Sequence, residues 1–191
     1  GVINELLLQF GQWMEAQQYS QMLVAGYYSY SWLEATHVLS LMLCIGSLFI
    51  IDFRMLGLVM PNVPATTIAA RLHKPMIIGF VIMFFTGVLL VYAKPVETIQ
   101  SLWFRIKMLL LVLAFINAWV FNTRMQAADG SWDMDPVAPK PLRVGAIISL
   151  VLWCGVVTMG RYIPYDWVDC TNTDNATILW AAGCVEQLRA L

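Results

Sequence analysis

Four long runs of the chain contain no charged residue. They cover residues 35–51, 75–93, 108–123 and 144–160, and each is 16 to 19 residues long. With its apolar flanks, each run approaches the roughly 20 residues that a helix needs to cross a bilayer. Backbone polar groups in lipid must be paired within the segment, which favours helices. The pattern predicts an all-α integral membrane four-helix bundle with transmembrane helices over 31–58, 66–93, 101–123 and 143–163.

The first 29 residues show a different pattern. Apolar residues recur there at helical spacing between polar ones, and they are Ile3, Leu6, Leu7, Phe10, Trp13 and Met14. This spacing is typical of an amphipathic helix that lies on the membrane surface. A helix that docks on the bundle gives the same spacing and is the alternative. We predict an N-terminal amphipathic surface helix within residues 1–29.

A polar tail follows the last span, over residues 164–191. Cys170 and Cys184 flank its most polar part, and the segment from Ala176 onward is typical of a short amphipathic helix. In an oxidising compartment the two cysteines can form a disulfide, whereas a reducing one would leave two free thiols. We predict the Cys170–Cys184 disulfide and a short C-terminal helix. The whole chain, residues 1–191, is interpreted as a single membrane domain.

Composition and charge narrow the class of protein. Hydrophobic residues make up 60% of the chain and charged residues 12%, against about 25% charged residues in soluble domains. A net charge of −1 gives no sign of a nucleic-acid partner. No Lys or Arg precedes the first span, while the loops after the first and third spans, taken with the span ends that adjoin them, carry Arg54, Arg71, Lys74, Arg124, Lys140 and Arg143. The positive-inside rule therefore predicts cytoplasmic loops and outward-facing termini.

The candidate chemistry begins in the first span. Glu34 and His37 are three residues apart and share one helix face. His37 lies about five residues inside the outer end of the span, roughly 7–8 Å deep, where an imidazole is costly unless it faces the protein interior. Three interpretations stay open: ligation of a haem iron, a hydrogen bond to a partner such as Glu34 or a tyrosine, and a quinone, proton or copper site.

Haem b is the leading interpretation. Small four-helix membrane proteins hold it between helices with histidine as an axial ligand. Met108 and Met159 lie at a similar depth on the third and fourth spans, and either thioether can be the second ligand. Arg105, Lys107 and Arg161 stand at the outer ends of those spans, where they can pair haem propionates or reach lipid headgroups instead.

No motif of a stand-alone enzyme occurs, so the hypothesis is an electron-transfer subunit acting near the outer face. Glu34 would orient its neighbours, and His37 would be the metal ligand. The expected partners are the lipid bilayer and other membrane or periplasmic redox subunits. A cofactor-free accessory subunit of a larger complex and a copper-handling membrane protein are the alternatives.

Three further polar residues in the spans need partners. Arg54 is expected to reach phosphate headgroups at the end of the first span. Asp52, two residues earlier, is expected to pair with a basic residue such as Arg71 or Arg124. Asn117, deep in the third span, should hydrogen-bond between helices or to a cofactor.

The segment WLEATHVLSLMLCIGSLFIIDFRMLGL resembles the opening helix of a family of small bacterial inner-membrane proteins of unknown function. The likeness is carried by Trp32, Glu34 (one position off the pattern), His37, Gly46, Asp52, Arg54, Leu56 and Gly57. Later segments, GFVIMFFTGVLLVYA, FRIKMLLLVLAFINAWVF and ISLVLWCGVVTMGRYI, resemble that family's other helices, so the likeness covers residues 30–163. It implies a four-helix architecture and no particular chemistry. Taken with the charge distribution, it gives an expected bacterial inner-membrane protein with both termini in the periplasm.

The chain is also loosely similar to cytochrome b561-like and copper-resistance membrane domains. It departs from the b561 pattern because it lacks paired histidines at matching depth. Its other histidine, His73, lies near the opposite membrane face from His37.

Overall fold

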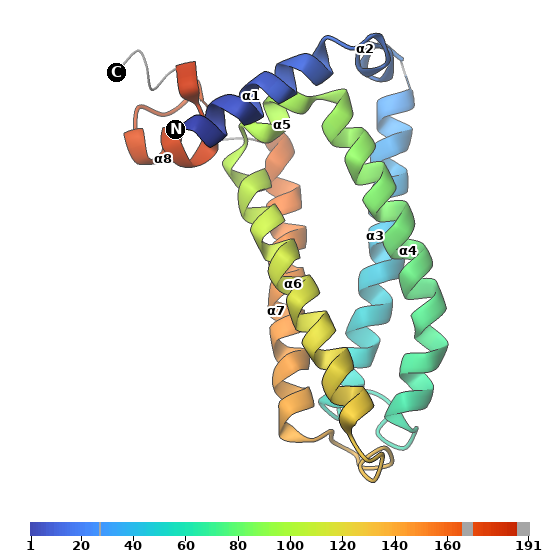
Figure 1. Ribbon diagram of the computed structural model, residues 1–191. Helices are drawn as coiled ribbons and strands as arrows, with labels where there is room; N and C mark the ends of the chain where they lie inside the picture. Colours follow the sequence, from blue (N-terminus) through green and yellow to red (C-terminus); the bar gives the residue numbers. More distant parts are fainter. Residues whose placement is uncertain (27, 166–169, 187–191) are drawn as a thin grey trace. The chain divides into compact units, whose positions relative to one another are not determined.

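The computed structural model describes residues 1–26, 28–165 and 170–186. This part of the chain is helical and contains no strand. Four helices are long and apolar enough to cross a membrane. They are α3 (Ser29–Met55), α4 (Ala65–Ala93), α6 (Leu102–Ala127) and α7 (Lys140–Tyr162), shown in Figure 1. The predicted all-α fold is confirmed, and the four apolar helices indicate a multi-pass membrane protein.

Short helices are more numerous than the sequence pattern predicts. The segment 1–29 holds two helices, α1 (Val2–Glu15) and α2 (Gln18–Ala25), because the backbone turns to an extended conformation at Gln17. Helix α5 (Pro95–Ile99) follows α4 and begins with a proline, the residue that is pre-organised for a first helical position. The predicted C-terminal helix is α8 (Ala176–Ala182), and residues 187–191 lie outside the described part of the chain.

The chain packs as two compact units. The platform unit comprises residues 1–36, 85–109 and 157–191, and therefore holds α1, α2, α5 and α8. The loop unit comprises residues 37–84 and 110–156, and therefore holds the loops that join α3 to α4 and α6 to α7. Each unit has its own packing and polar contacts.

In the loop unit, all four long helices contribute to one apolar core. One cluster contains Ile45, Met83, Ala114, Trp153 and Val156. A second cluster lies around Ile51 and Met55 and adds Trp132 from the loop. Helices α3 and α4 approach closely at Gly79, where a Cβ atom would stand 2.8 Å from the backbone nitrogen of Cys44. Only a residue without a side chain permits this contact.

In the platform unit, the short helices pack on the ends of the spans. Gly11 of α1 is buried against Val96 and Ile99 of α5. The hydroxyl of Ser20 in α2 donates to the carbonyl of Tyr92, 2.7 Å away, near the end of α4. The other face of α1 exposes a stripe of large apolar side chains at helical spacing, Ile3, Leu6, Phe10 and Trp13. Helix α1 therefore has the amphipathic character that the sequence predicts.

Candidate functional site

His37 lies in the third turn of α3. Its side chain is half-buried, and its carbonyl accepts a hydrogen bond of 2.9 Å from the hydroxyl of Ser40. Glu34, one turn earlier, is exposed. An imidazole at this position is partly shielded by the protein, whereas the carboxylate is not. Ligation of a haem iron by His37 stays a prediction.

The predicted methionine ligands both belong to the platform unit. Met108 of α6 is 45% exposed, and Met159 of α7 is half-buried. The two helices are in contact here, because the Nζ atom of Lys107 lies 3.3 Å from the position of a Cβ atom on Gly160. Each methionine is the sequence neighbour of one partner in this contact. Either can serve as an axial ligand only if its side chain turns toward the iron.

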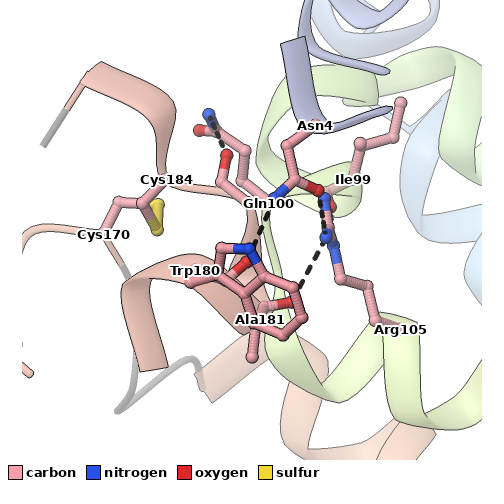
Figure 2. The surroundings of a disulfide bond; sticks show 9 residues. Asn4, Ile99, Gln100, Arg105, Cys170, Trp180, Ala181 and Cys184 are labelled. Atoms are coloured by element: carbon pink, nitrogen blue, oxygen red, sulfur yellow. Dashed lines mark hydrogen bonds between the residues drawn. A yellow bond between two sulfur atoms is a disulfide. The ribbon is translucent and has the colours of Figure 1, made fainter. Parts of the chain in front are cut away.

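Arg105 of α6 binds three other segments of the platform unit (Figure 2). Its Nε donates to the carbonyl of Ile99 at 3.0 Å, and one terminal nitrogen donates to Asn4 Oδ1 at 2.8 Å and to the carbonyl of Ala181 at 3.2 Å. Asn4 in turn donates to the carbonyl of Trp180 at 3.1 Å. The guanidinium thus joins α1, the end of α5 and α8 to α6. Pairing with a propionate would compete with these bonds.

Arg161 and Lys107, the other two basic residues predicted to pair with haem propionates, differ in their hydrogen bonding. Arg161 donates to the hydroxyl of Tyr165 at 2.7 Å and lies over its ring at 4.9 Å. Lys107 is half-buried against Gly160, and within the described residues its ammonium has no acceptor. A lysine inside a span without a counter-charge is costly. Pairing of Lys107 with a propionate stays a prediction.

The predicted disulfide is present between Cys170 and Cys184, whose Cα atoms are 5.5 Å apart. It closes a loop that contains α8. Asn175 caps α8 by accepting from the backbone nitrogens of Thr177 and Ile178, at 3.0 and 3.4 Å. Gly183 ends the helix in the left-handed region, with φ of 80°. The predicted short C-terminal helix is therefore confirmed as α8, which ends at the cap glycine.

At the opposite end of α3, Arg54 is 1% exposed. Its guanidinium donates to loop carbonyls at 2.8–3.3 Å, and these belong to Val63, Asp133, Asp135 and Pro136. The prediction that Arg54 reaches lipid headgroups is therefore wrong. A fork of five N–H donors can satisfy carbonyls of both loops, and this bonding compensates the burial of its charge.

Asp133, from the loop between α6 and α7, caps the first turn of α4. It accepts from the backbone nitrogen of Thr66 at 2.8 Å and from its hydroxyl at 2.6 Å. Burial raises the pKa of the Asp133 carboxyl, but the hydrogen bonds from Thr66 and Ala65 and the charge of Arg54 outweigh it, and the pKa lies below its ordinary value. A carboxylate at a helix N-terminus also complements the helix dipole.

Asp52 is buried inside the loop unit, where it is 4% exposed. It pairs with the hydroxyl of Ser149 on α7, while its Oδ2 atom has no hydrogen-bond partner in the described part of the chain. The prediction that it pairs with Arg71 or Arg124 is therefore wrong. The indole nitrogen of Trp132, which is also buried, lacks a partner as well. The sequence shows that Asp52 is a charged residue near a helix end, but it does not show that Oδ2 lacks a hydrogen-bond partner.

Comparison with known proteins places the chain in a family. The profile of a family of unknown function (DUF6644) matches residues 10–166, which is most of the chain. The chain belongs to the DUF6644 family. This supports the resemblance to a family of small membrane proteins of unknown function. No curated protein and no solved structure matches the chain.

In this DUF6644 protein, Asn117 provides a polar contact between two spans of the loop unit. Its side-chain nitrogen donates to the carbonyl of Gly145 on α7 at 3.0 Å, so the predicted bond between helices is confirmed. Asn117 also lines an open groove of about 320 Å³ between α6 and α7. Arg124 lines the same groove and donates to the carbonyl of Pro141 at 3.4 Å.

The arrangement of possible metal ligands in the DUF6644 protein is sparse. Among the described residues, no group of three or more His, Cys, Asp and Glu side chains lies close enough together to hold a metal ion. The residues that sequence reasoning misassigned were Arg54 and Asp52, because their partners come from loops and helices distant in sequence.

Proposed function

We propose that this protein is a haem-b-binding electron-transfer subunit of the bacterial inner membrane, with both termini in the periplasm. Two observations support the orientation. The first span is preceded by no Lys or Arg, while six basic positions cluster around the two loops of the loop unit. The Cys170–Cys184 disulfide suits an oxidising compartment on the platform side.

The observation that carries the haem proposal is the half-buried imidazole of His37 inside a transmembrane helix. Ionisable residues within spans are rare and mark functional sites by default. A neutral imidazole is the usual axial ligand of b-type haem. His37 would therefore hold the iron.

Lys107 is the basic residue that we propose for pairing with a carboxylate such as a propionate, because its side chain is half-buried beside Gly160 in a span. Arg105 is a weaker candidate because its donors already bind Ile99, Asn4 and Ala181. When bound, haem supplies the one-electron chemistry, and the chain supplies the ligands, a counter-charge and shielding from water.

The test is the visible spectrum of the purified full chain, oxidised and then reduced with dithionite. The matched pair of variants is His37→Ala and His73→Ala, since His73 is the other histidine and is exposed. We expect a haem absorption band in the wild type and in His73→Ala, and its loss in His37→Ala. Lys107→Met should retain the band with a changed midpoint potential, whereas Lys74→Met should leave the potential unchanged.

A colourless wild-type protein, reconstituted with haem and still colourless after removal of excess haem, would contradict the proposal. Metal analysis of that colourless sample then tests the copper alternative. A haem band that survives in His37→Ala would show that another residue ligates the iron, and it would contradict the role proposed for His37.

A second candidate, a cofactor-free accessory subunit, is favoured by the platform unit. Helix α1 is held by its packing on α5 and by the hydrogen bonds of Asn4 with Arg105 and with Trp180 of α8. It exposes large apolar side chains such as Phe10 and Trp13. A photo-crosslinking residue at Phe10, compared with one at Trp119 on the exposed face of α6, tests this role in native membranes. Adducts with another subunit at position 10 alone support it, and lipid adducts at both positions contradict it.

A further inference from the structure

Asp52 is a buried carboxyl that neither the proposed haem site nor the Arg54 contacts use. It lies one turn before the end of α3 and is 4% exposed. The hydroxyl of Ser149, on α7, is its hydrogen-bond partner, and Ser149 is itself 7% exposed. Since Oδ2 has no partner, the hydroxyl serves the other oxygen. Half of the carboxyl group is therefore buried without compensation.

The surroundings of Asp52 provide no counter-charge. Ile51, which precedes it in the sequence, and Met55, one helical turn later, belong to an apolar cluster. Every element packed there contributes apolar side chains: Ile68, Leu72 and Met76 from α4, Phe121 and Met125 from α6, Leu142 and Ala146 from α7, and Trp132 and Ala138 from the loop. The nearest charged residue along the chain is Arg54, whose guanidinium is bound by loop carbonyls. Asp133, the charged loop residue next to this cluster, binds Thr66 instead.

The ionised form of such a group is strongly disfavoured. Burying a carboxylate without a counter-charge costs several kcal/mol, and one hydroxyl does not offset this. A bound metal ion would need about six oxygen ligands, and the described residues offer no cluster of acidic or other ligating side chains. A proton is the cation that two carboxyl oxygens and one hydroxyl can hold.

We infer that Asp52 is a proton-binding site, which holds a proton while α3 and α7 are packed together and releases it only when the helices part or water enters. Ser149 fixes one oxygen, and Oδ2 is free to carry the proton. The inference goes beyond electron transfer and does not rest on haem binding. It gives the loop unit a ligand, which is the proton. It also couples the protonation of Asp52 to the packing of α3 against α7.

Infrared difference spectroscopy of the full chain in lipid nanodiscs tests this directly. The spectrum of the wild type minus that of Asp52→Asn, at mildly acidic pH, should contain the carbonyl stretch of a protonated carboxylic acid and no carboxylate bands. Asp129→Asn is the matched control. Asp129 is exposed, hydrogen bonds from Ser131 lower its pKa, and its difference spectrum should contain carboxylate bands only.

Ser149→Ala keeps Asp52 in place and tests the assignment even if Asp52→Asn does not fold. Its difference spectrum should show the protonated carbonyl stretch moving to higher frequency, because a hydrogen bond to that group is lost. Carboxylate bands in either the Asp52→Asn or the Ser149→Ala difference spectrum at mildly acidic pH would overturn the proposal.

The coupling to packing has its own readout. An unfolded chain exposes Asp52 to water, where it ionises, whereas the folded chain keeps the proton. The thermal midpoint of the wild type should therefore fall as the pH rises from mildly acidic to alkaline, and the midpoint of Asp52→Asn should fall less over the same interval. Equal pH dependence in the two proteins would contradict the coupling.

Discussion

Replacing Arg54 by lysine is the sharpest single perturbation of this fold. The residue is 1% exposed, and its guanidinium donates to four carbonyls from the two loops of the loop unit. Lysine keeps the positive charge and most of the length. It loses the planar fork of donors, which carries bonds in several directions at once. The substitution therefore separates the geometry of the donors from the charge.

The magnitude follows from the bonds that are lost. A hydrogen bond to a charged group contributes about 1.5–3 kcal/mol, and an unsatisfied buried acceptor costs about 1–3 kcal/mol. A lysine ammonium, with three donors, can retain one or two of the four bonds. Because the loop carbonyls regain water when the loops move, we expect a net loss of about 3 kcal/mol for Arg54→Lys.

Two assays read this loss in lipid nanodiscs or mild detergent. The thermal midpoint should fall, and a protease that cleaves before aspartate should cut the 128–139 loop faster, because Asp133 and Asp135 are held in place by Arg54 and Thr66. Arg143→Lys is the matched control, since Arg143 is exposed on α7. If Arg54→Lys behaves like Arg143→Lys in both assays, the guanidinium does not hold the loops together.

Two more predictions concern the ends of the bundle. The pKa of the Asp133 carboxyl is lowered in the fold. The ionised carboxylate therefore stabilises the fold above the ordinary pKa of an aspartate, and this stabilisation is lost as the pH falls through the lowered pKa. Over that acidic range, the unfolding midpoint should drop less in Asp133→Asn than in the wild type. Gly183 and Gly130 both have positive φ, but a Cβ atom on Gly183 would collide with the guanidinium of Arg105, whereas one on Gly130 meets no atom. Gly130→Ala should cost about 1 kcal/mol from the backbone alone, and Gly183→Ala should cost more in thermal unfolding; equal losses would refute the role of Arg105 in holding α8.

The membrane spans could be predicted because each is decided by local chemistry. A charge-free run of sufficient length must form a helix in lipid, whatever else it packs against, and the observed bounds of α4, Ala65–Ala93, differ from the predicted range 66–93 by a single residue. The disulfide could be predicted as a pairing because the tail holds its own two cysteines. The short helix α5 was missed because its five residues carry too little periodicity to be distinguished from a loop.

The roles of the polar residues were decided by the tertiary structure. From the sequence, Arg54 is a basic residue at a helix end and Arg105 is another, and both were expected to bind phosphate or propionate. In the fold, Arg54 instead binds loop carbonyls, one of them 82 residues away at Pro136. Arg105 donates to the carbonyl of Ala181, 76 residues away, while its pairing with a propionate stays a prediction. Whether a charged side chain meets lipid, water or a buried carbonyl depends on how loops fold back over it, and no local pattern encodes that.

Asp52 shows the same division most clearly. The sequence shows that Asp52 lies near the end of a span, and its residue type implies that burying it costs free energy. Only the packing of α3 against α7 determines that its partner is the hydroxyl of Ser149, that no cation lies beside it and that Oδ2 is left without a donor. Hydrophobic runs act through length and composition, which one segment carries by itself; a hydrogen bond needs two groups, and the second group comes from elsewhere in the fold.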